Sequence, residues 1–158
     1  MTDRLLRPRL RRVALLGALM MAGAGLGPLS GQVTIVAQKP LGFGQVTPGV
    51  PVTVATSDIA RRGEWALLGV AQSQMQLVLP TQLRNANGAT IPLTFGTTDG
   101  MVKWKNRQTV VNPRSSFTVK TNASDGDAIL YLGGTASPAV GQQAGTYTAT
   151  ITLMVVGL

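Results

Sequence analysis

The basic stretch around Trp104 is the first candidate for chemistry. Trp104 lies between Lys103 and Lys105, and Arg107 follows closely. An aromatic ring among cations can hold a single nucleic-acid strand through base stacking and phosphate contacts. One ring is a poor stacking platform, however, and outward lysines beside an inward tryptophan commonly protect an edge strand from aggregation. We therefore expect an edge strand here and no nucleic-acid partner.

Two polar stretches could bind ions. Arg61 and Arg62 could contact an anion, but their polar surroundings favour a solvated loop. Asn122, Asp125 and Asp127 faintly resemble a calcium loop. Such a loop needs about six to eight oxygen ligands and usually ends in a bidentate glutamate, and no glutamate follows here. A turn is the better interpretation, so we expect no metal site and no cofactor.

The residue types that most enzymes use for catalysis are missing from the sequence. The 158 residues include no histidine and no cysteine, which removes the commonest general base, the commonest zinc ligand and every Ser-His-Asp or Cys-His arrangement. A serine–lysine pair remains open on composition, but the Gly-x-Ser-x-Gly pattern is absent. We expect that the protein is not an enzyme. Without disulfides, its stability must come from sheet packing or from assembly.

The N-terminus has the pattern of a secretory signal peptide. Residues 1–12 are rich in arginine, and residues 13–24 form an apolar run that ends in small residues. We expect a signal-peptide helix that is cleaved after Ala24, or as late as residue 31, and a flexible linker over residues 25–31. An uncleaved anchor is the alternative, but the run is shorter than the roughly 20 apolar residues of a membrane span.

This leader predicts a protein that is secreted, periplasmic or at the cell surface, with no membrane span once the signal is removed. The remaining residues, 32–158, form a single expected domain. The leader supplies half of the net charge of +8, so this domain is only mildly basic. Hydrophobic residues make up 44% and aromatic residues 4%, which predicts an aliphatic core. Low charge (13%) with 19 glycines favours an all-β exported domain.

The C-terminal region shows the clearest strand pattern. Over residues 145–156, apolar side chains such as Ile151 and Leu153 alternate with threonines. This period of two indicates a strand with one buried and one exposed face. A shorter alternation near the start of the mature chain places Val33, Ile35 and Ala37 on one face, and it predicts the first strand.

Further apolar or alternating stretches lie between turn-forming residues along the rest of the chain. They cover residues 50–56, 65–71, 74–79, 90–97, 101–111, 117–121 and 128–132. Pro80 should end one strand, and an Asn-Gly turn signal occurs at residues 87–88. We therefore expect about eight to ten short strands in an antiparallel β-sandwich. The order of the strands stays open, because alternation fixes faces and not neighbours.

Two short blocks of sequence carry a family resemblance. Residues 41–49 read Leu-Gly-Phe-Gly-Gln-Val-Thr-Pro-Gly, and they resemble the Leu-x-Phe-Gly-x-x-x-Pro-Gly opening of the domain of unknown function 4402 family of secreted bacterial proteins. Residues 132–135 and 143–147 are similar to the Gly-Gly-Thr and Ala-Gly-Thr-Tyr segments at that family's close. The resemblance spans most of residues 33–156. It implies an immunoglobulin-like β-sandwich, similar to spore coat protein U and to pilin-like domains.

Two functions follow as expectations. By resemblance, the chain is a structural or interaction protein, a surface or fimbria-like subunit that assembles by β-strand donation. The implied partners are copies of itself, other surface subunits and a periplasmic chaperone. The strand with Val33, Ile35 and Ala37 could then fill a neighbour's groove, or it could pair within its own domain. The alternative function is a monomeric periplasmic or secreted module that binds a glycan or a small ligand.

Overall fold

The computed structural model describes residues 33–69, 72–120 and 127–157, and the described chain is all-β. The signal peptide, the cleavage at Ala24 and the linker over residues 25–31 that are expected from the sequence lie outside these ranges. No helix that could cross a membrane occurs in the described residues. The twelve strands are β1 Thr34–Lys39, β2 Val52–Val54, β3 Gly63–Leu68, β4 Gln72–Val78, β5 Gln82–Arg84, β6 Thr90–Thr94, β7 Gly100–Trp104, β8 Arg107–Val111, β9 Phe117–Lys120, β10 Ala128–Leu132, β11 Gly134–Ala136 and β12 Thr152–Gly157.

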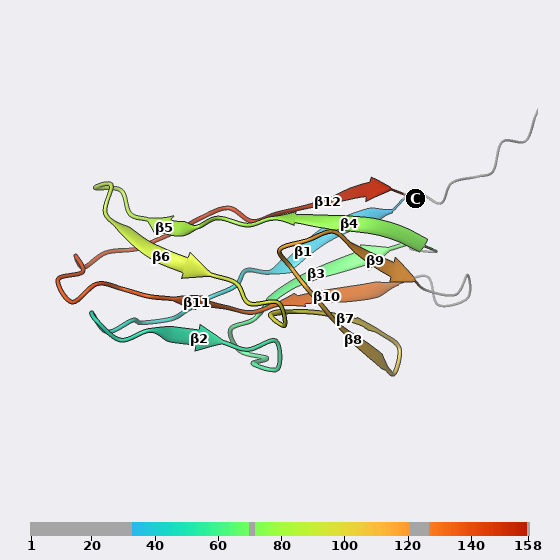
Figure 1. Ribbon diagram of the computed structural model, residues 1–158, viewed down its shortest axis with the longest axis horizontal. Helices are drawn as coiled ribbons and strands as arrows, with labels where there is room; N and C mark the ends of the chain where they lie inside the picture. The colour runs from blue at the N-terminus through green and yellow to red at the C-terminus, as the bar shows by residue number, and fades with distance from the viewer. Residues whose placement is uncertain (1–32, 70–71, 121–126, 158) are drawn as a thin grey trace, which may run out of the picture.

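The strands form three sheets in which every ladder is antiparallel (Figure 1). The first sheet has the order β1-β3-β10-β7-β8, the second β2-β11-β6-β5, and the third β12-β4-β9. An isolated bridge between Arg84 and Thr148 continues the pairing of the C-terminal segment beyond β12 toward β5. The chain from β4 to β5 therefore faces the segment that ends in β12 along most of its length.

Side chains from all three sheets meet in one core. Leu67 and Leu130 come from the first sheet, Ile91 from the second, and Met75 and Val119 from the third, and all five are fully buried. Because different sheets contribute to the same cluster, they pack face to face in a sandwich-like arrangement. The core is mainly aliphatic, as the composition predicts, but Phe43, Trp65, Phe95 and Phe117 are also buried in it.

Gly133 lies where one long strand passes from the first sheet to the second. Before it, β10 pairs with β3 and β7, and after it, β11 pairs with β2 and β6. A Cβ atom at Gly133 would collide with the backbone carbonyl of Val54, so only glycine fits this crossing. In Figure 1, β10 and β11 follow one another along the lower part of the molecule, opposite β4 and β5.

The predicted alternation is confirmed in three strands. Inward residues are buried and their neighbours are exposed, as a half-buried strand requires. The buried residues are Ser73, Met75 and Leu77 in β4, Ile91 and Leu93 in β6, and Phe117 and Val119 in β9.

Other expectations need correction. The structure has twelve strands in the described residues, not eight to ten, partly because β5 and β11 are three-residue strands with too little pattern to predict. The last strand begins at Thr152 rather than at residue 145. The facing chain contains Pro80, which has no amide hydrogen to donate to a ladder, so the pairing is interrupted between Thr152 and the bridge at Thr148.

Candidate functional site

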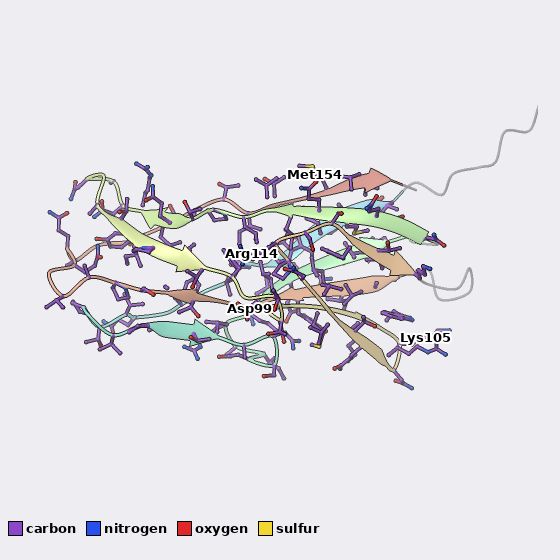
Figure 2. The ribbon with its side chains drawn as sticks, viewed as in Figure 1. Asp99, Lys105, Arg114 and Met154 are labelled. Atoms are coloured by element: carbon purple, nitrogen blue, oxygen red, sulfur yellow. The ribbon has the colours of Figure 1, made fainter. Side chains whose placement is uncertain are left out.

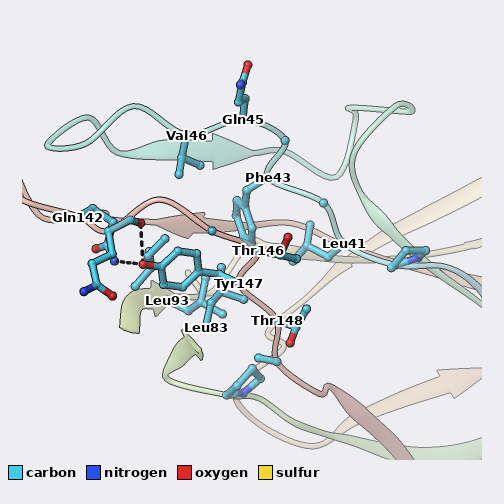
Figure 3. Close-up of a pocket in the computed structure, with 18 of the residues that line it drawn as sticks. Leu41, Phe43, Gln45, Val46, Leu83, Leu93, Gln142, Thr146, Tyr147 and Thr148 are labelled. Carbon is cyan, nitrogen blue, oxygen red and sulfur yellow. Dashed lines mark hydrogen bonds between the residues drawn. The ribbon is translucent and has the colours of Figure 1, made fainter. Parts of the chain in front are cut away.

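A cleft of about 680 Å³ opens in the described structure (Figure 3). It lies between two chain segments that are far apart in sequence, residues 40–48 and residues 142–151, and its floor comes from β5 and β6. The main lining residues are Leu41, Phe43, Val46, Pro80, Leu83, Ile91, Leu93, Gln142, Tyr147 and Ile151.

The first wall of the cleft is a segment that belongs to no sheet and turns at Gly44, whose φ is 69°. It is held at both ends, since the Gly42 amide donates to the Arg61 carbonyl and the Gly49 amide to the carbonyls of Pro138 and Ala139. Between these ties, the amides of residues 43–46 donate to no backbone carbonyl of the described chain. The buried Phe43 side chain anchors the segment, and its backbone keeps unused hydrogen-bonding capacity.

The second wall is fixed by the side chain of Tyr147. Its hydroxyl accepts a hydrogen bond from Gln142 Nε2 at 2.6 Å and donates to the Gln143 carbonyl at 2.8 Å. The bridge between Thr148 and Arg84, with both bonds at 2.9 Å, ties the same segment to β5. Figure 3 shows the Tyr147 ring beside Leu83 and Leu93, facing the segment that carries Val46. The ring is thus a positioned apolar surface.

The cleft has an apolar and uncharged lining. Its floor residues Ile91 and Leu93 are buried, and no Asp, Glu, Lys or Arg is among the residues that line it. A carboxylate or ammonium group would lose its hydration there without gaining a partner of opposite charge, which is unfavourable. The lining offers no acid–base pair, but its apolar side chains can bind an uncharged ligand through dispersion contacts, and its backbone can bond to polar atoms of that ligand.

The candidate first strand lies at the edge of the first sheet. Ile35 pairs with Leu67 and Ala37 with Trp65, so in this structure β1 is joined to β3 of the same chain. Val33 and Ile35 are half-buried against the core, whereas Ala37 is exposed. The expected single buried face therefore covers only the first part of this strand.

The basic stretch around Trp104 forms a hairpin and is not an edge strand. Lys103 and Trp104 belong to β7, which lies between β10 and β8, and the turn contains Lys105 with φ of 47°. The edge strand is β8, which begins at Arg107. Trp104 packs against the core, as expected for an inward tryptophan. The sequence stretch was interpreted as one strand because a turn of such ordinary residues has no strong signal.

The two arginines at residues 61 and 62 differ from one another. Arg61 is exposed and pairs with Asp58 at 2.8 Å, as a solvated loop residue would. Arg62 is largely buried, and it pairs with Glu64 at 2.9 Å, so the expectation of a solvated loop is wrong for this residue.

The suspected calcium loop falls largely outside the described residues, which include Asp127 but not Asn122 or Asp125. The Asp127 carboxylate accepts a hydrogen bond from the Gly69 amide at 3.2 Å. No cluster of three or more His, Cys, Asp or Glu side chains that could hold a metal ion occurs in the part of the chain that the structure describes.

Sequence reasoning did not find the cleft, although it singled out the segments that form it. The two blocks with the family resemblance contribute to opposite walls of the cleft, residues 41–49 to the first and residues 143–147 to the second. Nothing in either block indicates that they meet, since about a hundred residues separate them. Comparison with protein-family models, with curated protein sequences and with solved structures finds no match to the chain.

Proposed function

We propose that this chain is an exported bacterial interaction protein without catalytic activity. Its cleft receives an extended, uncharged apolar segment of a neighbouring surface subunit by β-strand addition. In this proposal the domain is an immunoglobulin-like β-sandwich of the domain of unknown function 4402 family. The apolar leader over residues 13–24 supports export to the periplasm, the cell surface or the medium.

The observation that carries the proposal is the free backbone beside the cleft. Peptides that add to a sheet edge gain affinity from main-chain hydrogen bonds and specificity from pockets that hold alternate side chains. Residues 43–46 offer amides with no backbone partner in the described chain, next to about 680 Å³ of uncharged apolar space. The backbone carbonyls of an incoming strand could accept hydrogen bonds from amides of this segment, which turns at Gly44 (φ of 69°), and the strand could place apolar side chains over Ile91 and Leu93.

The position of the two resemblance blocks supports the same proposal. Residues 41–46 and 143–147 line opposite walls of the cleft. If members of the family share these blocks, they share this cleft, and the blocks then serve recognition as well as folding.

A second candidate is a monomeric secreted or periplasmic module that binds a small uncharged ligand. The volume favours it, because ligand pockets commonly span about 300–1,000 Å³ and are lined mainly by apolar side chains with a few polar groups. Tyr147 and Phe43 would supply aromatic contacts to such a ligand.

Gel analysis of the protein from the cells that produce it would test the first candidate. Subunits joined strand into groove dissociate slowly, so an unboiled sample should give a ladder of bands that collapses to one band on boiling. Val46→Glu puts a charge into the apolar cleft and should abolish the ladder. Val140→Glu is the matched control, because Val140 is 87% exposed and outside the lining.

A single monomer band from the unmodified protein in both lanes would contradict strand addition. A rise in melting temperature with small uncharged ligands, lost in Val46→Glu and kept in Val140→Glu, would then establish the second candidate.

A further inference from the structure

Edge strands in the described structure carry features that prevent contact with other sheets, except for β12. Natural proteins protect sheet edges with charges, prolines, short strands or bulges. Four edge strands contain a charged residue, namely Lys39 in β1, Arg84 in β5, Arg107 in β8 and Lys120 in β9. The edge strand β2 has only three residues and follows Pro51. The six-residue β12 has no charge and no proline, and its one bulge falls near its end, between Val155 and Gly157.

The outer surface beside this edge carries exposed apolar side chains next to the exposed glutamines of β4. Met154 and Val156 of β12 and Val78 of β4 are 37%, 44% and 51% exposed, and they point away from the core. Figure 2 shows Met154 at the upper rim of the molecule. On the inner face, Leu153 and Val155 are only half-buried against the core. Both faces of β12 therefore have apolar area left to cover, and its outer edge has no strand partner within the described residues.

Charge indicates what could cover this edge. The described chain is basic, so two copies repel one another over most of their surface. The strands β4 and β12 contain no charged residue at all. Two copies can therefore approach along these two strands with little repulsion, and neither partner would bury an unpaired charge.

We propose that β12 pairs with β12 of a second copy, antiparallel across a two-fold axis, so that two three-stranded sheets join into one sheet of six. A strand that meets its own copy around a two-fold axis is necessarily antiparallel, which matches the other ladders of the fold. Directly opposite residues of an antiparallel pair point to the same face of the sheet. The two-fold axis must therefore pass midway between the two copies of one residue, and not between two successive residues.

The register centred on Met154 satisfies this condition and keeps the regular part of β12 before its bulge in the interface. Met154 then lies opposite its own copy on the outer face, and Leu153 lies opposite Val155 on the inner face. This interface does not rest on the proposed function, because β12 begins after the last residue that lines the cleft, Ile151.

Disulfide trapping can test the register because the chain has no cysteine of its own. Met154→Cys should give a covalent dimer on mild oxidation, since directly opposite Cα atoms in antiparallel strands lie about 4.5–5.5 Å apart, within disulfide range. Gln76→Cys is the matched control. Gln76 is the ladder partner of Met154 and lies one strand further from the axis, so it should stay unlinked. Equal cross-linking of the two variants would overturn the inference.

Sedimentation equilibrium tests the interface without an engineered disulfide. The mature protein is used at about 100 μM, where mass action favours weak dimers. We expect twice the chain mass for the unmodified protein. Met154→Lys should give the chain mass, because it places two like charges across the axis. Gln76→Lys should stay a dimer, and so should the cleft variant Val46→Glu. A monomeric unmodified protein, or a Met154→Lys variant that remains dimeric, would refute the β12 interface.

Discussion

The guanidinium carbon of Arg62 lies 3.6 Å from the centre of the Tyr131 ring. The Arg62 side chain also bonds to the Glu64 carboxylate at 2.9 Å and to the Thr56 carbonyl at 2.9 Å. Glu64 is the ladder partner of Tyr131, so one planar cation covers a cross-strand pair of β3 and β10. This contact closes the outer face of the first sheet next to the strand that leads to Gly133.

Replacing Arg62 should destabilise the protein more than replacing Arg61. A lysine at position 62 keeps the charge, but it cannot stack on the Tyr131 ring while it donates to both Glu64 and Thr56. Arg62→Lys should therefore lower the free energy of unfolding by about 1–2 kcal/mol. Urea denaturation measures this loss. Arg61→Lys is the control and should change little, because its partner Asp58 forms an exposed pair. Equal losses in the two variants would show that the ring contact contributes nothing.

Gly133 should be intolerant of any side chain. A methyl group there would overlap the Val54 carbonyl, and both backbones are held in ladders, so Gly133→Ala should cost about 3 kcal/mol. Gly42→Ala is the matched control. No atom lies within 4 Å of a Cβ at that position, so its stability should change by less than about 0.5 kcal/mol. Thermal unfolding of the two variants compares them directly, and a Gly133→Ala melting temperature equal to that of Gly42→Ala would contradict the close approach.

The faces of the strands could be predicted from the sequence, because burial imposes a period of two on residue type. The alternation over β4 predicts Met75 and Leu77 inside, and both are buried. The turn signal after β5 is confirmed as well: Gly88 has φ of 85°, and Asn85 Oδ1 accepts hydrogen bonds from the Asn87 and Ala89 amides.

The neighbours of the strands and the cleft could not be predicted in this way. Strand order depends on contacts between distant residues, and no local pattern specifies them. The segment with Phe43 and the segment with Tyr147 each read as ordinary loop or strand sequence. Their common role as two walls follows from hydrogen bonds to distant residues, which join Gly49 to Pro138 and Thr148 to Arg84.

Ser73 is a buried polar residue that should be dispensable. Its side chain is 1% exposed, and its hydroxyl oxygen has no hydrogen-bond partner in the described chain. Burying an unpaired hydroxyl is unfavourable, so Ser73→Ala should leave stability unchanged or raise it by about 1 kcal/mol. Urea denaturation of Ser116→Ala gives the comparison, because that hydroxyl bonds to Gln74 Nε2 at 3.2 Å and its loss should not stabilise the fold. A clear destabilisation by Ser73→Ala would mean that the hydroxyl has a partner in solution.

The carboxylate of Asp58 should make the stability depend on acid pH. The side-chain hydrogen bond from Arg61 is the main cause that holds the pKa of Asp58 below its ordinary value of 3.8, with smaller contributions from the Arg61 charge and two backbone amides. Because the pKa is lower in the folded state, the stabilisation is fully present above about 3.8 and is lost as pH falls through the folded pKa.

The difference in unfolding free energy between the unmodified protein and Asp58→Ala should therefore be largest at neutral pH and shrink in strong acid. Asp58→Asn should fall between them at neutral pH, since its side-chain oxygen can still accept from the Ala60 and Arg61 amides. A difference between the unmodified protein and Asp58→Ala that stays constant down to the lowest pH would exclude a role for the carboxylate charge.

The Tyr147 hydroxyl should hold the second wall of the cleft in place. Tyr147→Phe removes two hydrogen bonds, to Gln142 and Gln143, and should cost about 1 kcal/mol of stability. Tyr131→Phe is the control, because its ring contact with Arg62 survives the change. Hydrogen exchange should become faster at residues 142–148 in Tyr147→Phe alone, since local opening lies at the low-stability end of a fold. If exchange at these amides is unchanged, the hydroxyl does not order this wall, and the shape of the cleft depends on the bridge between Arg84 and Thr148 instead.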